Sequence, residues 1–272
     1  MLSSHILSVV TFVYGLAFLL FILHLLFKRN FLNTAGDIAV SVGCSAHGAA
    51  LILRWAESYR IGWGHVPLSN LYESLIFFSF LLAVVYLVFR LATKRKFLGV
   101  FMIPLPLLAL GYASLSPDVE RAISPLVPAL QSNWLTIHVL TCFMAYAAFA
   151  FSFVAAVLYL VKKEGKEGVL PPPEALDDLV YRGIMAGMPL LTLGIITGSA
   201  WAHYAWGSYW SWDPKETWSL ITWIVYAIFL HLRLMGRWRG TRSAVLSIVG
   251  FFTVIFTFLG VNYILSGLHS YL

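Results

Sequence analysis

The sequence predicts an all-α fold, a polytopic transmembrane helix bundle of about eight spans with both termini on the external side. Of its 272 residues, 60% are hydrophobic and 11% are charged, whereas a soluble domain usually carries about 25% charged residues. A helix that crosses a bilayer needs roughly 20 mostly apolar residues. Eight stretches meet this requirement, namely 6–27, 36–56, 70–92, 97–115, 133–161, 182–200, 217–234 and 243–267.

Two of these stretches need a separate argument. The first, 6–27, begins almost at Met1 with no basic segment before it and is longer than the apolar part of a signal peptide, so we expect a retained helix. The fourth, 97–115, contains Pro104 and Pro106. Membrane helices tolerate proline where neighbouring helices satisfy the freed carbonyl groups.

The basic residues predict the orientation of the spans. Fourteen of the 18 Lys and Arg residues lie in alternate connections, and basic residues collect on the cytoplasmic side of a membrane. This pattern places both termini outside and explains the net charge of +6 without a nucleic-acid partner. The fourteen are Lys28, Arg29, Arg90, Lys94, Arg95, Lys96, Lys162, Lys163, Lys166, Arg182, Arg233, Arg237, Arg239 and Arg242.

One stretch has the composition of a linker. Residues 162–181, KKEGKEGVLPPPEALDDLVY, combine charges, glycines and three prolines, which predicts a cytoplasmic connection. We expect it to join two parts of one bundle, so that 1–272 form a single integral membrane domain.

A tryptophan-rich stretch is the strongest functional signal. Residues 201–216 are expected to form an external loop, with six large aromatic residues within its first twelve positions. Aromatic residues also form belts at membrane interfaces, but a belt is spread over all helix ends. A dense shelf suits a flat, mostly apolar ligand with a polar edge, such as haem. The aromatic residues are Trp201, Trp206, Trp210, Trp212, Tyr204 and Tyr209.

Asp213 and Pro214 close this loop. Asp is favoured at a helix N-cap and Pro at the first helical position, so the pair predicts the start of the next helix. Asp213 therefore belongs to the candidate haem-binding loop chiefly as its anchor.

Four histidines are candidate haem ligands. His138 lies one turn into its span, on the helix face of Trp134, and His269 follows the last span, both on the predicted external side. Two neutral imidazoles from separate helix ends can hold haem iron axially. His231 and His47 lie within spans, either as ligands of a deeper haem or as hydrogen-bonded interior residues.

The remaining polar candidates are less specific. Arg54, Arg60 and Lys215 are external cations that could bind haem propionates. Cys44 and Cys142 each lie inside a span and are expected to be small packing residues. No CxxCH is present, so the chain is not itself a c-type cytochrome.

Together these residues resemble a known family. The stretch WGSYWSWDPKETWSLITWIVYAIFLHLRL resembles the tryptophan-rich WWD signature of haem-handling proteins, and three flanking stretches resemble its CcsA-type (ResC-like) branch of System II. These are GHVPLSNLYESL at 64–75, LVPALQSNWLTIHV at 126–139 and GVNYILSGLHSYL at 260–272. The likeness runs from about residue 47 to the C-terminus, while longer relatives carry additional spans and soluble segments.

The resemblance implies roles for the histidines. His138 and His269 match the family's two external axial ligands, and His231 matches its intramembrane ligand. The family's opposite inner ligand comes from a partner subunit, although His47 also matches a recurrent family position.

The resemblance further implies a cytochrome c synthase of the holocytochrome c synthase (haem lyase) type, which attaches haem b to the CxxCH thiols of an apocytochrome c. Expected partners are a CcsB/ResB-like membrane subunit and thioredoxin-like thiol reductants. The expected location is the bacterial cytoplasmic membrane, or the thylakoid membrane in a plastid. The alternatives are a haem exporter without synthase activity and a cytochrome b-like subunit with two permanent haems.

Overall fold

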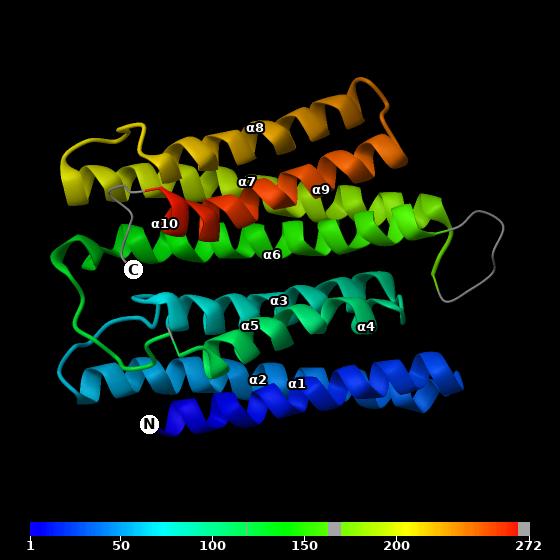
Figure 1. The fold of residues 1–272 in the computed structure, drawn as a ribbon, viewed down its shortest axis with the longest axis horizontal. Coiled ribbons are helices and arrows are strands. Elements are labelled where there is room, and N and C mark those ends of the chain that lie inside the picture. The colour runs from blue at the N-terminus through cyan, green and yellow to red at the C-terminus, as the bar shows by residue number, and fades with distance from the viewer. Residues whose placement is uncertain (118, 163–169, 266–272) are drawn as a thin grey trace. The chain divides into compact units, whose positions relative to one another are not determined.

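The computed structural model describes residues 1–117, 119–162 and 170–265, with the side chains of all of these except 262 and 263. Within these ranges the regular structure is helical, and eight helices are long and apolar enough to cross a membrane. The predicted all-α bundle of eight spans is thereby confirmed (Figure 1).

The chain was predicted to form a single membrane domain, and the structure resolves two compact units, Met1–Leu126 and Val127–Leu272. Their boundary lies in the proline-containing segment between spans four and five, not in the predicted linker 162–181. Each unit contributes four of the spans.

The first unit packs its helices around buried aromatic residues. Tyr14 and Phe21 are buried on α1, and Phe21 meets Tyr86 of α3 edge to face, with 6.0 Å between the ring centroids. Its helices are α1 (Leu2–Phe27), α2 (Asn30–Arg60), α3 (Leu71–Thr93), α4 (Leu98–Met102) and α5 (Pro104–Leu115).

The fourth span is divided between α4 and α5. Pro104 occupies the first position of α5, where its missing N–H leaves no helical hydrogen bond unmade. The buried Ser79 hydroxyl of α3 donates to the Pro106 carbonyl at 2.9 Å. This hydrogen bond ties α3 to α5 through a buried polar group.

The second unit carries the candidate site. Its core includes a close stack between Phe149 of α6 and Tyr226 of α8, with 3.8 Å between the ring centroids. Its elements are η1 (Pro128–Leu130), α6 (Asn133–Val161), α7 (Pro173–Trp206), α8 (Pro214–Leu234), α9 (Thr241–Ile255), the π-helical turn η2 (Phe256–Gly260) and α10 (Val261–Ile264).

Both predicted loops of this unit are shorter than expected. Helix α7 begins at Pro173, so the second half of the predicted linker is helical, while 163–169 lie outside the described residues. Proline is pre-organised for a first helical position, and Glu174 in the first turn complements the helix dipole. At the other end α7 continues to Trp206 and stops at Gly207, whose φ of 79° favours glycine.

A row of glycines lets α7 approach α6 closely. Each lies where a Cβ atom would come within 2.9 Å of a side-chain atom of α6. Their spacing keeps them on one helix face, and small residues at such faces allow membrane helices to pack tightly. The glycines, each followed by the α6 residue that it faces, are Gly183 with Ser152, Gly187 with Phe149, Gly194 with Cys142, and Gly198 with His138.

Candidate functional site

Gly198 of α7 and His138 of α6 form the centre of the candidate site. The half-buried His138 imidazole of α6 lies against α7, with its Nδ1 atom 2.7 Å from the carbonyl oxygen of Gly194. Because a carbonyl only accepts hydrogen bonds, Nδ1 carries the proton in the neutral ring. The Nε2 atom is then unprotonated, which is the state that binds a metal.

Two further groups fix the plane of this ring. A Cβ atom at position 198 would lie 2.5 Å from Nδ1 of His138, so only glycine leaves room for the ring there. On α7, Trp201 lies nearly parallel to the imidazole, with an interplanar angle of 14° and 6.2 Å between the centroids. The Trp201 indole N–H donates to the Ala129 carbonyl at 2.7 Å, which ties the stack to η1.

Trp201 therefore differs from the other tryptophans of the predicted shelf. Only 2% of it is exposed, because it belongs to the last turns of α7 rather than to the loop. Trp206 and Trp210 are half-buried, whereas Trp212 is 68% exposed. The irregular loop is confined to Gly207–Asp213, and its aromatic side chains are Tyr209, Trp210 and Trp212, of which Tyr209 is 60% exposed.

A carboxylate network holds this loop to α8. Asp213 is the N-cap of α8 and forms a capping box with Glu216, as expected for a helix anchor. One Glu216 oxygen accepts from the backbone N–H groups of Ser211 at 2.7 Å and Asp213 at 3.2 Å. Trp212, between these two residues, has a left-handed φ of 60°, and its ring meets Trp210 at an interplanar angle of 90°.

This backbone conformation leads to a prediction about Trp212. We expect Trp212→Gly to be more stable than Trp212→Ala by about 1 kcal/mol, because a left-handed conformation costs an alanine but not a glycine. Both variants lose the exposed ring, so haem retention should fall equally in both. Thermal unfolding and haem content of the two purified variants check this, and equal stability of the two would contradict it.

The other predicted ligands lie in three different settings. His231 on α8 is exposed, on the same side as Ile224, Ile228 and Met235. His47, in the first unit, is fully buried, with Nδ1 3.4 Å from the Tyr14 hydroxyl and Nε2 without a hydrogen-bond partner among the described residues. His269 lies outside the described residues.

The three cations considered for propionates are now distinguishable. Arg54 is fully buried and paired with Glu73 at 2.8 Å, so its charge is already compensated inside the first unit. Arg60 is exposed in the last turn of α2. Lys215 lies in the first turn of α8, and none of the ion pairs among the described residues includes it.

The sequence interpretation missed the two glycines that seat His138. It assigned Trp134 as the aromatic neighbour, but Trp134 is 47% exposed and the ring beside His138 belongs to Trp201. The available signal was the four-residue spacing of Gly194 and Gly198, because such pairs mark close helix contacts in membranes.

Comparison with known proteins shows the family to which the chain belongs. The model of the family described as "Cytochrome C assembly protein" matches residues 68–269, which include the tryptophan loop, His138, His231 and His269. Cytochrome c biogenesis protein CcsA of Chlamydomonas reinhardtii is 45% identical over 229 residues, covering 81% of this chain and 64% of that protein. CcsA of Marchantia polymorpha is 36% identical over 306 aligned positions, covering 93% of this chain and 94% of its own length.

A solved structure supports the same fold. The cytochrome c haem lyase CcmF superposes with a TM-score of 0.70 at 16% identity, covering 95% of this chain and 48% of CcmF. The chain thus spans about half of the CcmF chain and 64% of the Chlamydomonas protein. The family model matches residues 68–269, which is more than half of the chain. The chain therefore belongs to the cytochrome c assembly protein family and is similar to its CcsA-type members.

Proposed function

We propose that the chain is the haem-handling subunit of a System II cytochrome c synthase. Haem b passes from an inner position at His231 to an outer position beside the tryptophan loop, where His138 and His269 hold the iron. The observation that carries this proposal is the seating of His138. Its Nδ1 atom is held by the Gly194 carbonyl, its ring is aligned by Trp201, and its Nε2 atom is left as a ligand.

The chemistry at this outer position is the joining of haem vinyl groups to the two thiols of an apocytochrome c CxxCH. Each thiol adds across one vinyl group: a sulfur–carbon bond forms, and the proton goes to the terminal vinyl carbon. No electron acceptor is consumed. The chain supplies orientation, because held reactants lose little further entropy on the way to the transition state. We assign Lys215 to a propionate, because it lies in the first turn of α8, directly after the tryptophan loop, and belongs to none of the ion pairs among the described residues.

The exposure of His231 supports a partner subunit. A histidine among exposed apolar residues of a membrane span is unfavourable unless another group meets it. A CcsB/ResB-like subunit would bring the second ligand of the inner haem to this face. Thioredoxin-like reductants would keep the substrate thiols reduced. In this scheme the termini and the tryptophan loop face the external side of a bacterial cytoplasmic or thylakoid membrane.

Visible spectra of the purified complex test the proposal. We expect His138→Ala and His269→Ala to lose the outer haem and to stop maturation of a CxxCH reporter, because each removes an axial ligand. Added imidazole should restore the haem spectrum by filling the vacated coordination position. His231→Ala should instead remove the inner haem.

The outcomes separate the competing functions. If the outer histidine variants still mature the reporter at the normal rate, the chain only exports haem and the synthase assignment fails. If haem content is unchanged in all three variants, neither haem position exists as proposed. A His5→Ala variant is the matched control, because His5 is exposed on α1, in the first unit, and lies outside the tryptophan loop.

A further inference from the structure

Helix α8 carries His231 but is weakly held by apolar packing. Of the eight spans found among the described residues it is the least buried, with 17% of its most apolar stretch covered against 67% for α6. The rotation of this helix about its own axis is therefore set by a few specific contacts, namely the buried rings of Tyr226 and Phe229 and several polar contacts. Halfway along α8, the Trp223 indole N–H donates to the Thr192 hydroxyl of α7 at 2.9 Å.

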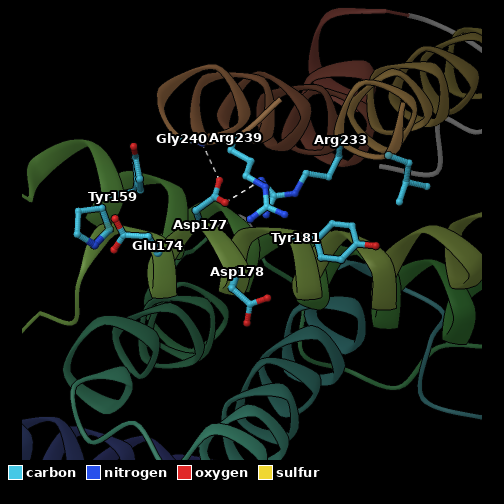
Figure 2. A pocket seen from close by; sticks show the side chains of 10 residues that line it. Tyr159, Glu174, Asp177, Asp178, Tyr181, Arg233, Arg239 and Gly240 are labelled. Carbon is cyan, nitrogen blue, oxygen red and sulfur yellow. Dashed lines mark hydrogen bonds and ion pairs between the residues drawn. The ribbon is translucent and has the colours of Figure 1, made fainter. Parts of the chain in front are cut away.

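At the opposite end of α8 the contact is a buried ion pair. The Arg233 Nη1 atom lies 2.7 Å from the Asp177 Oδ2 atom of α7, and each side chain is only 8% exposed. The second Asp177 oxygen accepts from the Gly240 backbone N–H at 2.9 Å, where α9 begins. Figure 2 shows this carboxylate between the Arg233 guanidinium and Gly240. A single side chain of α7 thus joins the end of α8 to the start of α9.

The surroundings of the pair restrict it further. Arg233 also donates to the Trp238 carbonyl at 3.2 Å, and its guanidinium carbon lies 5.2 Å from the centre of the Tyr181 ring. Arg233, Asp177 and Tyr181 line a cavity of about 480 Å³, which is also lined by Glu174 and Arg239 (Figure 2). The guanidinium is therefore fixed in position and direction, not merely neutralised.

The geometry of a helix connects this pair to His231. Residues two positions apart are separated by roughly 200° around the axis. With Arg233 directed towards α7, His231 must point away from α7, and its exposure beside Ile228 and Met235 agrees with this.

We propose that Asp177 is a positioning residue for the inner haem ligand: by holding Arg233 and Gly240, it fixes the rotation of α8 that presents His231 to the inner haem. This inference rests on the proposed role of His231. Groups that orient a ligand without touching the metal commonly change metal affinity by about 10–100-fold when they are removed.

A spin label tests the rotation without relying on haem. We place a nitroxide on His231→Cys in a Cys44→Ala/Cys142→Ala background and measure its collisions with lipid-dissolved oxygen. Labels at the exposed Ile228 and the buried Phe229 calibrate the range. Asp177→Ala should shift the 231 label from the Ile228 level towards the Phe229 level. Asp178→Ala is the matched control, because it removes the adjacent carboxylate of α7. Asp178 pairs with Arg182 in a solvent-exposed position, where the two side chains are 49% and 58% exposed.

The haem spectrum then tests the consequence. In a His138→Ala background, which leaves the inner haem alone, Asp177→Ala should lower haem affinity about tenfold. The charge-exchanged double variant, Asp177→Arg with Arg233→Asp, should recover a large part of the lost haem affinity. The variants are compared only at equal membrane yield and with monodisperse particles.

An unchanged label signal in Asp177→Ala overturns the positioning role, whatever the haem spectrum shows. If the label moves but His231→Ala leaves the inner haem intact, the anchoring of α8 is supported and the proposed ligand role of His231 fails instead.

Discussion

Replacement of Gly198 by alanine should strongly reduce haem retention at the outer position. The added methyl group would lie 2.5 Å from the His138 Nδ1 atom, closer than any stable contact, and the ring is already confined by the Gly194 carbonyl and Trp201. The imidazole must therefore leave its seat, which breaks the hydrogen bond that selects the tautomer. We expect haem affinity at this position to fall by about 10–100-fold, measured as haem retained during purification.

The control for this variant is Gly111→Ala. Gly111 lies within α5, and a Cβ atom there meets no atom within 4 Å, so the substitution should leave haem content unchanged. In a His231→Ala background, which is expected to lack the inner haem, any further haem loss caused by Gly198→Ala comes from the outer position. Wild-type haem retention in Gly198→Ala would show that His138 does not bind iron from the seat described.

The sequence predicted the spans because lipid imposes a strict apolar composition, but it made the second span too short at both ends. Helix α2 runs from Asn30 to Arg60 rather than over 36–56. The added turn at its start contains Asn33, whose amide donates to the Lys96 carbonyl at 3.1 Å. A hydropathy average treats such a residue as the end of an apolar stretch. It includes the unfavourable free energy of burying a polar group but not the hydrogen bond that offsets it.

The candidate site was predictable only in part, for a related reason. His138 stands out because an ionisable residue near the end of a membrane span is uncommon. The groups that hold its ring in place come from α7, a separate segment of chain, through Gly194, Gly198 and Trp201. The outward direction of His231 likewise depends on the pairing of Arg233 with Asp177. These contacts join different helices, so they cannot be predicted from the spacing of residues along one helix.

The first unit contains a charged pair with no exposed surface. Arg54 of α2 and Glu73 of α3 are both 0% exposed, with 2.8 Å between Nε and Oε1. The second Glu73 oxygen accepts from the Ser69 backbone at 2.8 Å and hydroxyl at 2.6 Å, and Arg54 also donates to the Arg121 carbonyl at 3.0 Å. The pair therefore ties two helices to the loops on either side of α3–α5.

Removal of one partner should destabilise this unit severely. Glu73→Ala leaves the Arg54 guanidinium buried without a counter-charge, which costs about 3–5 kcal/mol of unfolding free energy. The double change Arg54→Met with Glu73→Leu should cost far less, because apolar replacement of both partners removes the desolvation penalty together with the attraction. Reversible unfolding in bicelles, followed by tryptophan fluorescence, gives both free energies.

The exposed pair of Asp178 and Arg182 provides the reference. Its side chains are 49% and 58% exposed, so Asp178→Ala should change the unfolding free energy by only about 0–1 kcal/mol. The result that separates an unpaired charge from lost hydrogen bonds is whether the changes in unfolding free energy caused by the Arg54 and Glu73 substitutions are additive. If the double variant is as unstable as Glu73→Ala, the loss comes from the hydrogen bonds to Ser69 and the Arg121 carbonyl rather than from an unpaired charge. The role of the pair would then be to hold the loops, and the charge itself would contribute little to stability.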